Sequence, residues 1–407
     1  MTLLRYLLAV LLWLVILALL AIAIVPSFLD RRYYDGSASG HYDGERFFNP
    51  DGEDTASTPT RRSRGAFLFA QATGNDGRPP WPARVAVTLA KPPRRVAGDR
   101  MLVTWVGHAT VLVQTAGLNI LTDPIWSDTA GPFGFGPRRV AEPGIRFDDL
   151  PPIDLVVVSH NHYDHMDLAT LKRLWARDKP LIVTSLGNDS VIGQAGVPAT
   201  ALDWGMHAVV TDPNADWLRC DPVAPCPDDV RATVHVTRNH HWSSRWFTDR
   251  NRALWSSFVI ELPSGGNLFF AGDTGAGDYA WADEARRYGP VRLALLPIGA
   301  FRFQPGQMST GSHVGPVEAV ELFRRLGATR GIAIHWGTFR LSYEARDTPP
   351  RLLKAAMACA RVPGRFDAIA IGRTVEVPVA TDATPAPPRP RGEIDGCLDT
   401  PAVRALK

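Results

Sequence analysis

Cysteine, unbalanced charge and long apolar runs are all scarce in this sequence, and each scarcity excludes a class of protein. Four cysteines in 407 residues are too few for a disulfide-dense fold. A formal net charge of only +3 argues against a protein that binds nucleic acid by neutralising its phosphates. The mean hydropathy of -0.07 excludes a multi-span membrane protein. Because 45% of the residues are hydrophobic and 9% aromatic, the chain can still bury a sizeable core, and disorder throughout is excluded.

One apolar run, residues 6–25, departs from this average, since it contains no charged residue. At about 1.5 Å per residue a helix of this length spans a hydrocarbon core, so we expect a membrane anchor. The alternatives are a cleaved signal peptide, with Ala21-Ile22-Ala23 as a small-residue cleavage site, and a buried core helix. Arg5 before the run and Arg31 and Arg32 after it leave the positive-inside bias nearly tied.

The four cysteines bear on the compartment. Cys220 and Cys226 are six residues apart in a proline-rich stretch, and Cys359 and Cys397 would pin the tail. An even count with plausible pairs fits an oxidising compartment, although four unpaired thiols remain the alternative. We therefore expect the folded part outside the cytoplasm, on the periplasmic side if the source is bacterial.

Composition divides the chain into four parts. Residues 1–27 are the anchor or signal peptide, and residues 28–100 are an extended linker rich in Asp, Gly and Ser and then in proline. Residues 101–377 alternate β-rich runs with amphipathic stretches such as 168–176 and 316–326, which indicates a layered α/β domain. Residues 378–407 form a Pro/Ala-rich tail that we expect to be irregular.

The most informative motif is HxHxDH at 160–165, directly after the apolar run DLVVVS. Imidazole and carboxylate are ligands that suit zinc, iron and manganese. A polar loop that is rich in histidine by chance is the alternative. The position after a buried strand, where sites form in layered α/β proteins, favours a metal site.

Three other predicted strands also end in ligand-type residues. Residues 234–237 lead to His240 and His241, residues 268–271 lead to Asp273, and residues 332–334 lead to His335. Four such strand ends imply one shared crevice. Seven ligands are too many for one four-coordinate zinc, and they suit two metals about 3.5–4 Å apart.

These residues resemble the metallo-β-lactamase superfamily. An ordered set of segments from about residue 100 to 355 narrows the resemblance to the branch that contains N-acylphosphatidylethanolamine-hydrolysing phospholipase D and its bacterial relatives. The segments include WVGHATVLVQ at 105–114, LTDPIWSD at 121–128, SHNHYDHMD at 159–167, FAGDTG at 270–275 and IHWGTF at 334–339. The resemblance implies a four-layer αββα sandwich over residues 101–377, and the apolar run at 6–25 adds one expected transmembrane helix ahead of it. Ahead of residue 100 the match is weak and centres on residues 47–50.

The resemblance also implies a role for each ligand. One metal would be held by His160, His162 and His241, and the other by Asp164, His165 and His335, with Asp273 bridging both. His240 is the rival of His241, which we prefer because the family's ligand directly precedes a tryptophan, here Trp242. Two zinc ions are the expected cofactors, with iron or manganese as alternatives.

Three further residues complete the expected site, in which Asp164 and Asp273 also count as catalytic. His313 is the candidate for protonating the leaving group. Asp123 would orient a ligating histidine from outside the ligand set; the alternative is a turn-forming aspartate before a proline. His108 would line the site, or else is a structural histidine.

The expected function is that of a membrane-anchored dinuclear hydrolase. The resemblance implies a phosphodiesterase of phospholipase D type that acts on N-acylphosphatidylethanolamine-like phospholipids through a metal-bridging hydroxide. A lactonase or other ester hydrolase of the same superfamily, a di-iron redox protein and a non-catalytic membrane-tethered metal-binding protein remain alternatives. The expected partners are a phospholipid or small-molecule ester and a membrane, and not nucleic acid.

Overall fold

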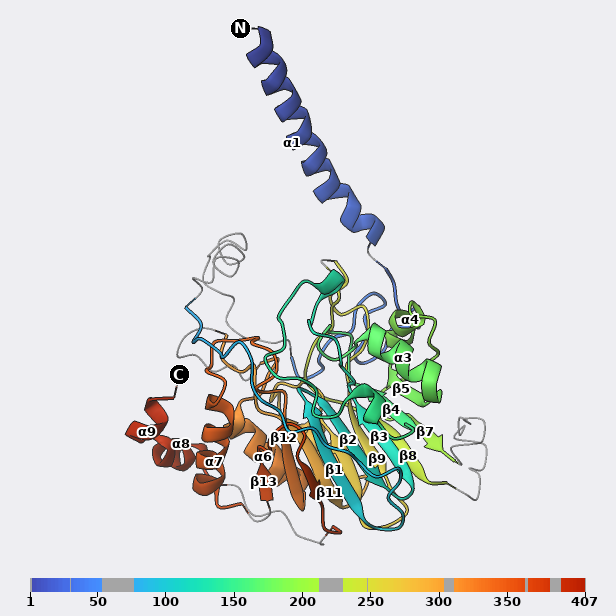
Figure 1. Ribbon diagram of the computed structural model, residues 1–407, viewed down its shortest axis with the longest axis vertical. Coiled ribbons are helices and arrows are strands. Elements are labelled where there is room, and N and C mark those ends of the chain that lie inside the picture. Colours follow the sequence, from blue (N-terminus) through green and yellow to red (C-terminus); the bar gives the residue numbers. More distant parts are fainter. Residues whose placement is uncertain are drawn as a thin grey trace.

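The computed structural model describes residues 2–29, 31–52, 77–211, 230–246, 248–303, 311–362, 365–380 and 389–406. Its first element is the apolar helix α1 (Thr2–Leu29), which projects away from one end of the globular part (Figure 1). Within it, the 20 residues Leu3–Ile22 are long and apolar enough to cross a membrane, and 0% of that window is buried. A signal sequence near the N-terminus passes the same test, so both readings of this segment remain.

Two sheets of seven described strands each form the centre of the domain. The first has the order β14-β1-β2-β3-β4-β5-β6 and the second the order β13-β12-β11-β10-β9-β8-β7. In the first sheet β3, β4, β5 and β6 are parallel, and in the second sheet β10, β11, β12 and β13 are parallel. The strands are β1 (Met101–Gly107), β2 (Thr110–Thr115), β3 (Leu118–Thr122), β4 (Leu155–Val158), β5 (Leu181–Ser185), β6 (Thr200–Leu202), β7 (His207–Val210), β8 (Ala232–Thr237), β9 (Ser257–Glu261), β10 (Asn267–Phe270), β11 (Val291–Pro297), β12 (Arg330–Ile334), β13 (Arg365–Asp367) and β14 (Thr374–Glu376).

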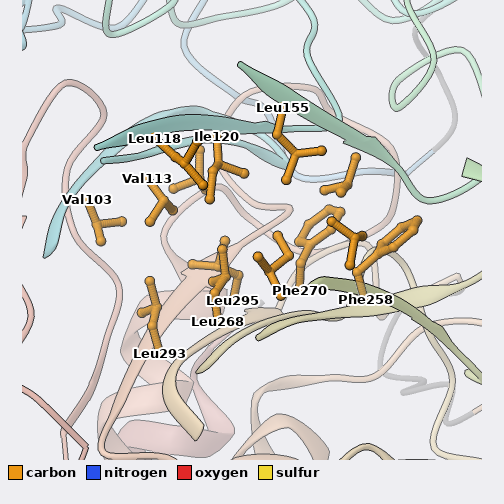
Figure 2. Packing of buried hydrophobic residues seen from close by; sticks show 14 of the residues in the cluster. Val103, Val113, Leu118, Ile120, Leu155, Phe258, Leu268, Phe270, Leu293 and Leu295 are labelled. Carbon is orange, nitrogen blue, oxygen red and sulfur yellow. The ribbon is translucent and has the colours of Figure 1, made fainter. Parts of the chain in front are cut away.

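The core lies between the two sheets and follows the period of two that a strand imposes on its side chains. Val111 and Val113 of β2 face the opposite sheet, whereas Leu112 between them faces outward into a second apolar cluster. Figure 2 shows the inward side chains of both sheets meeting, with Leu155 on one side and Phe270 on the other. Both faces of these strands are buried, which is why their sequences are continuous apolar runs.

Helices cover the outer face of each sheet. The short helices α3 (Leu168–Asp178) and α4 (Asn188–Gly193) lie against the first sheet, and Asp167 caps the start of α3 by accepting from two backbone amides. The second sheet is covered by α5 (Ala280–Arg286), α6 (Pro316–Leu326) and α7 (Thr348–Ala360). The predicted four-layer αββα sandwich is therefore confirmed.

Both ends of the chain contribute more to the domain than their composition indicates. In the extension, Tyr42 and Phe47 are buried and pack against Trp255. The tail, which we expected to be irregular, forms α8 (Arg391–Leu398) and α9 (Pro401–Arg404), because its apolar side chains pack outside α7. A disulfide between Cys359 and Cys397 joins α7 to α8. The other expected pair, at positions 220 and 226, lies outside the described residues.

Candidate metal centre

The predicted ligand segments all follow strands and meet at one edge of the two sheets. The HxHxDH segment follows β4 of the first sheet, and His241, Asp273 and His335 follow β8, β10 and β12 of the second. Parallel strands end at the same edge of a sheet, so strands far apart in the sequence deliver these side chains to one place. The structure brings six of the seven predicted ligands together in two adjoining clusters, with Asp273 between them.

The first cluster consists of His160, His162 and His241, whose ligand atoms lie within 4.8 Å of one another. Nε2 of His160 lies 2.7 Å from Nδ1 of His162. The ring of His241 lies 4.7 Å from that of His160 and 5.2 Å from that of His162, between centroids. Three imidazoles that converge from two sheets suit one face of a metal site.

Hydrogen bonds determine which nitrogen carries the proton in two of these rings. Nδ1 of His241 donates to the carbonyl of Ser312 at 2.8 Å, because a carbonyl only accepts. The hydroxyl of Ser159 donates to Asp123, so its oxygen accepts from Nδ1 of His160 at 2.9 Å. Burial lowers the pKa of both histidines well below its usual range. Each Nε2 is therefore left with a lone pair directed into the cluster, as a metal ligand requires.

The second cluster contains Asp164, His165 and His335, together with His108. Nδ1 of His335 donates to the carbonyl of Gly299 at 3.3 Å, which directs its Nε2 inward. The Nε2 atoms of His165 and His335 lie 3.6 Å and 3.4 Å from the same oxygen of Asp164. Two imidazoles and one carboxylate thus face a common point on the other side of the site.

Asp273 lies between the two clusters. Its Oδ2 is 3.1 Å from Nε2 of His165 and 3.1 Å from Nε2 of His335, and it also groups with His241 and His313. Burial lowers the pKa of His335, but Asp273 and the neighbouring carboxylate outweigh burial and raise that pKa to about 9. The two carboxylates therefore concentrate negative charge at the point where a divalent cation would be held. The position suits a bridging carboxylate.

Asp123 follows β3 and is completely buried. One of its oxygens accepts from the backbone amide of Ser159 at 2.7 Å. The other accepts from the hydroxyl of Ser159 at 2.6 Å and from Nδ1 of His165 at 2.6 Å. Asp123 therefore binds Nδ1 of His165 and leaves its Nε2 to the metal site. This is the role expected of a carboxylate that orients a ligating histidine from behind.

His108 lies within the second cluster rather than behind it. Its Nε2 is 2.9 Å from Oδ2 of Asp164, and its ring lies 4.2 Å from that of His335. Burial, with the neighbouring His335, lowers the pKa of His108 to about 3. His108, Asp123 and His335 all have positive φ angles, of 53°, 32° and 60°. Such backbone strain gathers at functional sites, where the surrounding fold maintains it.

His313 lies at the rim of the centre, just before α6. Its Nδ1 is 3.7 Å from Oδ2 of Asp273, and its ring lies 5.1 Å from that of His241. Burial lowers the pKa of His313, which favours the neutral ring at neutral pH. In that form one ring nitrogen still carries a proton.

His240 points away from the centre, and its surroundings reveal residues that the sequence reasoning missed. Its Nδ1 lies 3.0 Å from the carboxylate of Asp51 in the extension. Two residues earlier, the buried amide of Asn49 donates to the carbonyl of His241 at 2.9 Å and accepts from Nε1 of Trp255 at 3.1 Å. The extension thus holds the backbone of a predicted ligand, and the weak match at residues 47–50 was the one signal that pointed to it.

The donor set fits two divalent cations. Nε2 of His241, Nε2 of His165 and Oδ1 of Asp273 are buried atoms that make no hydrogen bond with any residue the structure describes. Buried polar atoms without partners are costly, and bound cations would satisfy them. The four other predicted ligands are of the same kinds, a combination that suits zinc, iron or manganese.

Comparison with known proteins shows which family the chain resembles. Residues 118–336 match the Beta-lactamase superfamily domain. The chain is 33% identical over 268 residues to N-acyl-phosphatidylethanolamine-hydrolyzing phospholipase D 1 of Caenorhabditis elegans, which covers 63% of this chain and 70% of that protein. It is 32% identical over 243 residues to the mitochondrial N-acyl-phosphatidylethanolamine-hydrolyzing phospholipase D of Saccharomyces cerevisiae, covering 59% of this chain and 48% of that protein. A possible metal-dependent hydrolase of Veillonella parvula shares the fold, with a TM-score of 0.51 and 15% identity over 68% of this chain and 99% of that one.

Proposed function

The chain belongs to the metallo-β-lactamase superfamily and is a metal-dependent hydrolase of that fold, and we propose that it is a membrane-anchored phosphodiesterase of phospholipase D type. The proposed substrate is an N-acylphosphatidylethanolamine-like phospholipid. The observation that carries the proposal is the convergence of two ligand clusters, joined by Asp273, at one edge of the sandwich. The names of the nematode and yeast relatives support the choice of substrate.

The residues of the chain hold and separate two metal sites. When bound, two zinc ions would activate a water molecule and take up the charge that develops on the phosphoryl oxygens. His160, His162 and His241 are the proposed ligands of one ion, and Asp164, His165 and His335 are those of the other. Asp273 sets their spacing because its carboxylate faces both clusters.

The proposed role of His313 is to donate a proton to the departing oxygen. Its place at the rim, beside Asp273 but outside the two triads, leaves it free to face a substrate. The neutral ring that burial favours can donate the proton it carries, so the role does not require a charged imidazole.

We further propose that α1 remains attached and tethers the domain to the bilayer that contains the substrate. Its 20 apolar residues have the length for this, and none of that window packs against the domain. The disulfide between Cys359 and Cys397 supports a domain on the oxidising side of the membrane.

The test combines metal content with parallel substrates. The purified full chain should contain two metal ions and hydrolyse N-acylphosphatidylethanolamine in mixed vesicles, but not a simple lactone. Asp273→Asn should lose turnover and one metal, whereas His207→Asn, a histidine on β7 outside the centre, should keep both. Turnover of the lactone alone would favour the lactonase alternative. Two bound metals without turnover of either substrate would favour a non-catalytic binding protein.

A further inference from the structure

A hairpin-like loop at residues 128–139 rises from the rim of the metal centre. Thr129 forms a backbone bridge with Arg138, and the amide of Ala130 donates to the carbonyl of Pro137 at 3.0 Å. Below them, the amide of Arg139 donates to the carbonyl of Asp128 at 2.9 Å. The loop is therefore closed at its base, and its tip is a distinct projection.

The base of this loop is connected to the metal centre through one neighbouring segment. Arg139 forms an antiparallel backbone bridge with Phe339, and its guanidinium lies 5.3 Å from the centre of the Phe339 ring. The ring of Phe339 lies 5.1 Å from that of His108, and the amide of His108 donates to the hydroxyl of Thr338 at 2.9 Å. The base of the loop is therefore linked to His108 of the metal centre through Phe339.

The tip presents two phenylalanines to the outside. Phe133 is 88% exposed and Phe135 is 75% exposed, and residues 129–137 contain no charged side chain. Exposed aromatic side chains grouped on one projection mark an interaction surface. Nothing within the described part of the chain packs over them.

The backbone holds these rings outward at a cost. Phe133 has a φ of 54°, in the left-handed region that bulky residues rarely adopt. A Cβ at Gly131 would meet the carbonyl oxygen of Phe135 at 1.9 Å, and one at Gly136 would meet that of Ala130 at 2.5 Å. Only glycine allows the two arms to approach this closely. The strained backbone and the close approach of the two arms indicate that this loop conformation serves to expose the two phenylalanine rings.

We propose that this loop inserts Phe133 and Phe135 into the lipid surface that faces the metal centre. The loop lies at the end of the globular part from which the exposed apolar helix α1 emerges (Figure 1). Two apolar contacts at the same end, one through α1 and one through the loop, would hold the metal centre close to the bilayer. Aromatic side chains on a surface projection enter the boundary between headgroups and acyl chains because this removes their apolar surface from water. The inference rests on the proposed function only in placing the domain at a bilayer.

The test measures the depth of the loop without using turnover. The full-length Phe135→Cys variant is labelled with a thiol-reactive fluorophore and reconstituted into phosphatidylcholine and phosphatidylglycerol vesicles that contain nitroxide-labelled acyl chains. The matched control is Ala97→Cys, an exposed position before β1 at the opposite edge of the sheet from His108. The identically treated unmodified chain gives the background from its own cysteines.

We expect loss of fluorescence for Phe135→Cys and none above background for Ala97→Cys. Equal quenching at both positions would overturn the inference. A probe at position 135 that is buried against a second copy of the chain in detergent would overturn it as well, since the loop would then be a contact between copies. If the probe is quenched but the unmodified protein does not hydrolyse lipid, the proposed function fails and the loop insertion stands. If lipid is hydrolysed without quenching, the function stands and the insertion fails.

Discussion

Replacing Asp123 by asparagine should disable one of the two proposed metal sites without changing any of its proposed ligands. Asparagine keeps one oxygen, which can still accept from the amide of Ser159, but it places an NH₂ group where the second oxygen now receives Nδ1 of His165. The imidazole must then accept at Nδ1 and carry its proton at Nε2. The lone pair that faces Asp164 and Asp273 is lost in that tautomer.

The size of the effect follows from these contacts. Loss of an outer partner that orients a ligating histidine costs about 10–100-fold in metal affinity. The hydroxyl of Ser159 also loses its acceptor inside a site where Asp123 is 0% exposed. One buried donor left unpaired costs about 1–3 kcal/mol, so Asp123→Asn should fold but be less stable by that amount.

Zinc titration of the chelator-stripped full chain against a chromophoric indicator measures both sites. The matched control is Asp154→Asn, because Asp154 is a buried carboxylate next to β4 at its other end, where it pairs with Arg95 and accepts from the amide of Asn119 at 2.8 Å. We expect Asp154→Asn to lower stability and leave both affinities unchanged. If Asp123→Asn binds two zinc ions as tightly as the unmodified protein, the tautomer reasoning is wrong.

Three further predictions follow from other contacts. Reduction of the disulfide between Cys359 and Cys397, which are 38 residues apart, should lower the free energy of unfolding by about 4 kcal/mol on the chain-entropy scale; denaturant curves with and without reductant measure this, and coincident curves would contradict it. Asn49→Ala should lower stability by about 1–3 kcal/mol and also weaken zinc binding, because the carbonyl of His241 loses its donor; unchanged zinc titrations would show that Asn49 is only structural. Burial raises the pKa of Glu321, but hydrogen bonds from Arg324 and Arg325 outweigh burial and lower that pKa below its usual 4.5. Glu321→Gln should therefore lower the free energy of unfolding by about 1 kcal/mol above pH 4.5, and this difference should vanish as the pH falls through the lowered pKa. Equal differences between the two proteins at pH 7 and at acid pH would refute this.

Local sequence carried enough information for much of the sandwich. The helix expected over residues 316–326 forms over those residues, because Pro316 suits its first turn and Gly327 adopts the left-handed conformation that ends it, with a φ of 60°. The run before His160 forms a buried strand because β-branched residues fill it from both faces. Strand ends then predicted where the ligand-type residues would gather.

Contacts between distant segments could not be predicted in the same way. The hydrogen bond of Asn49 to His241 joins residues 192 positions apart, and no local pattern encodes such a contact. The same holds for Tyr42 and Phe47, whose burial depends on Trp255. The orientation of the loop tip at 133–135 was equally hidden, since glycine and proline signal a turn but not the direction in which it presents its side chains.

The division of the ligands between the two sheets has a consequence for assembly. The first sheet supplies the HxHxDH residues, whereas His241, Asp273 and His335 come from the second, which is built from the later part of the sequence. Neither half alone contains a complete ligand set for either ion. Metal uptake therefore reports that both halves of the polypeptide have been made and have met, and an interrupted chain that lacks β12 has no His335 to offer. A metal ion held by ligands from both sheets would link the two halves of the sandwich and stabilise the folded chain.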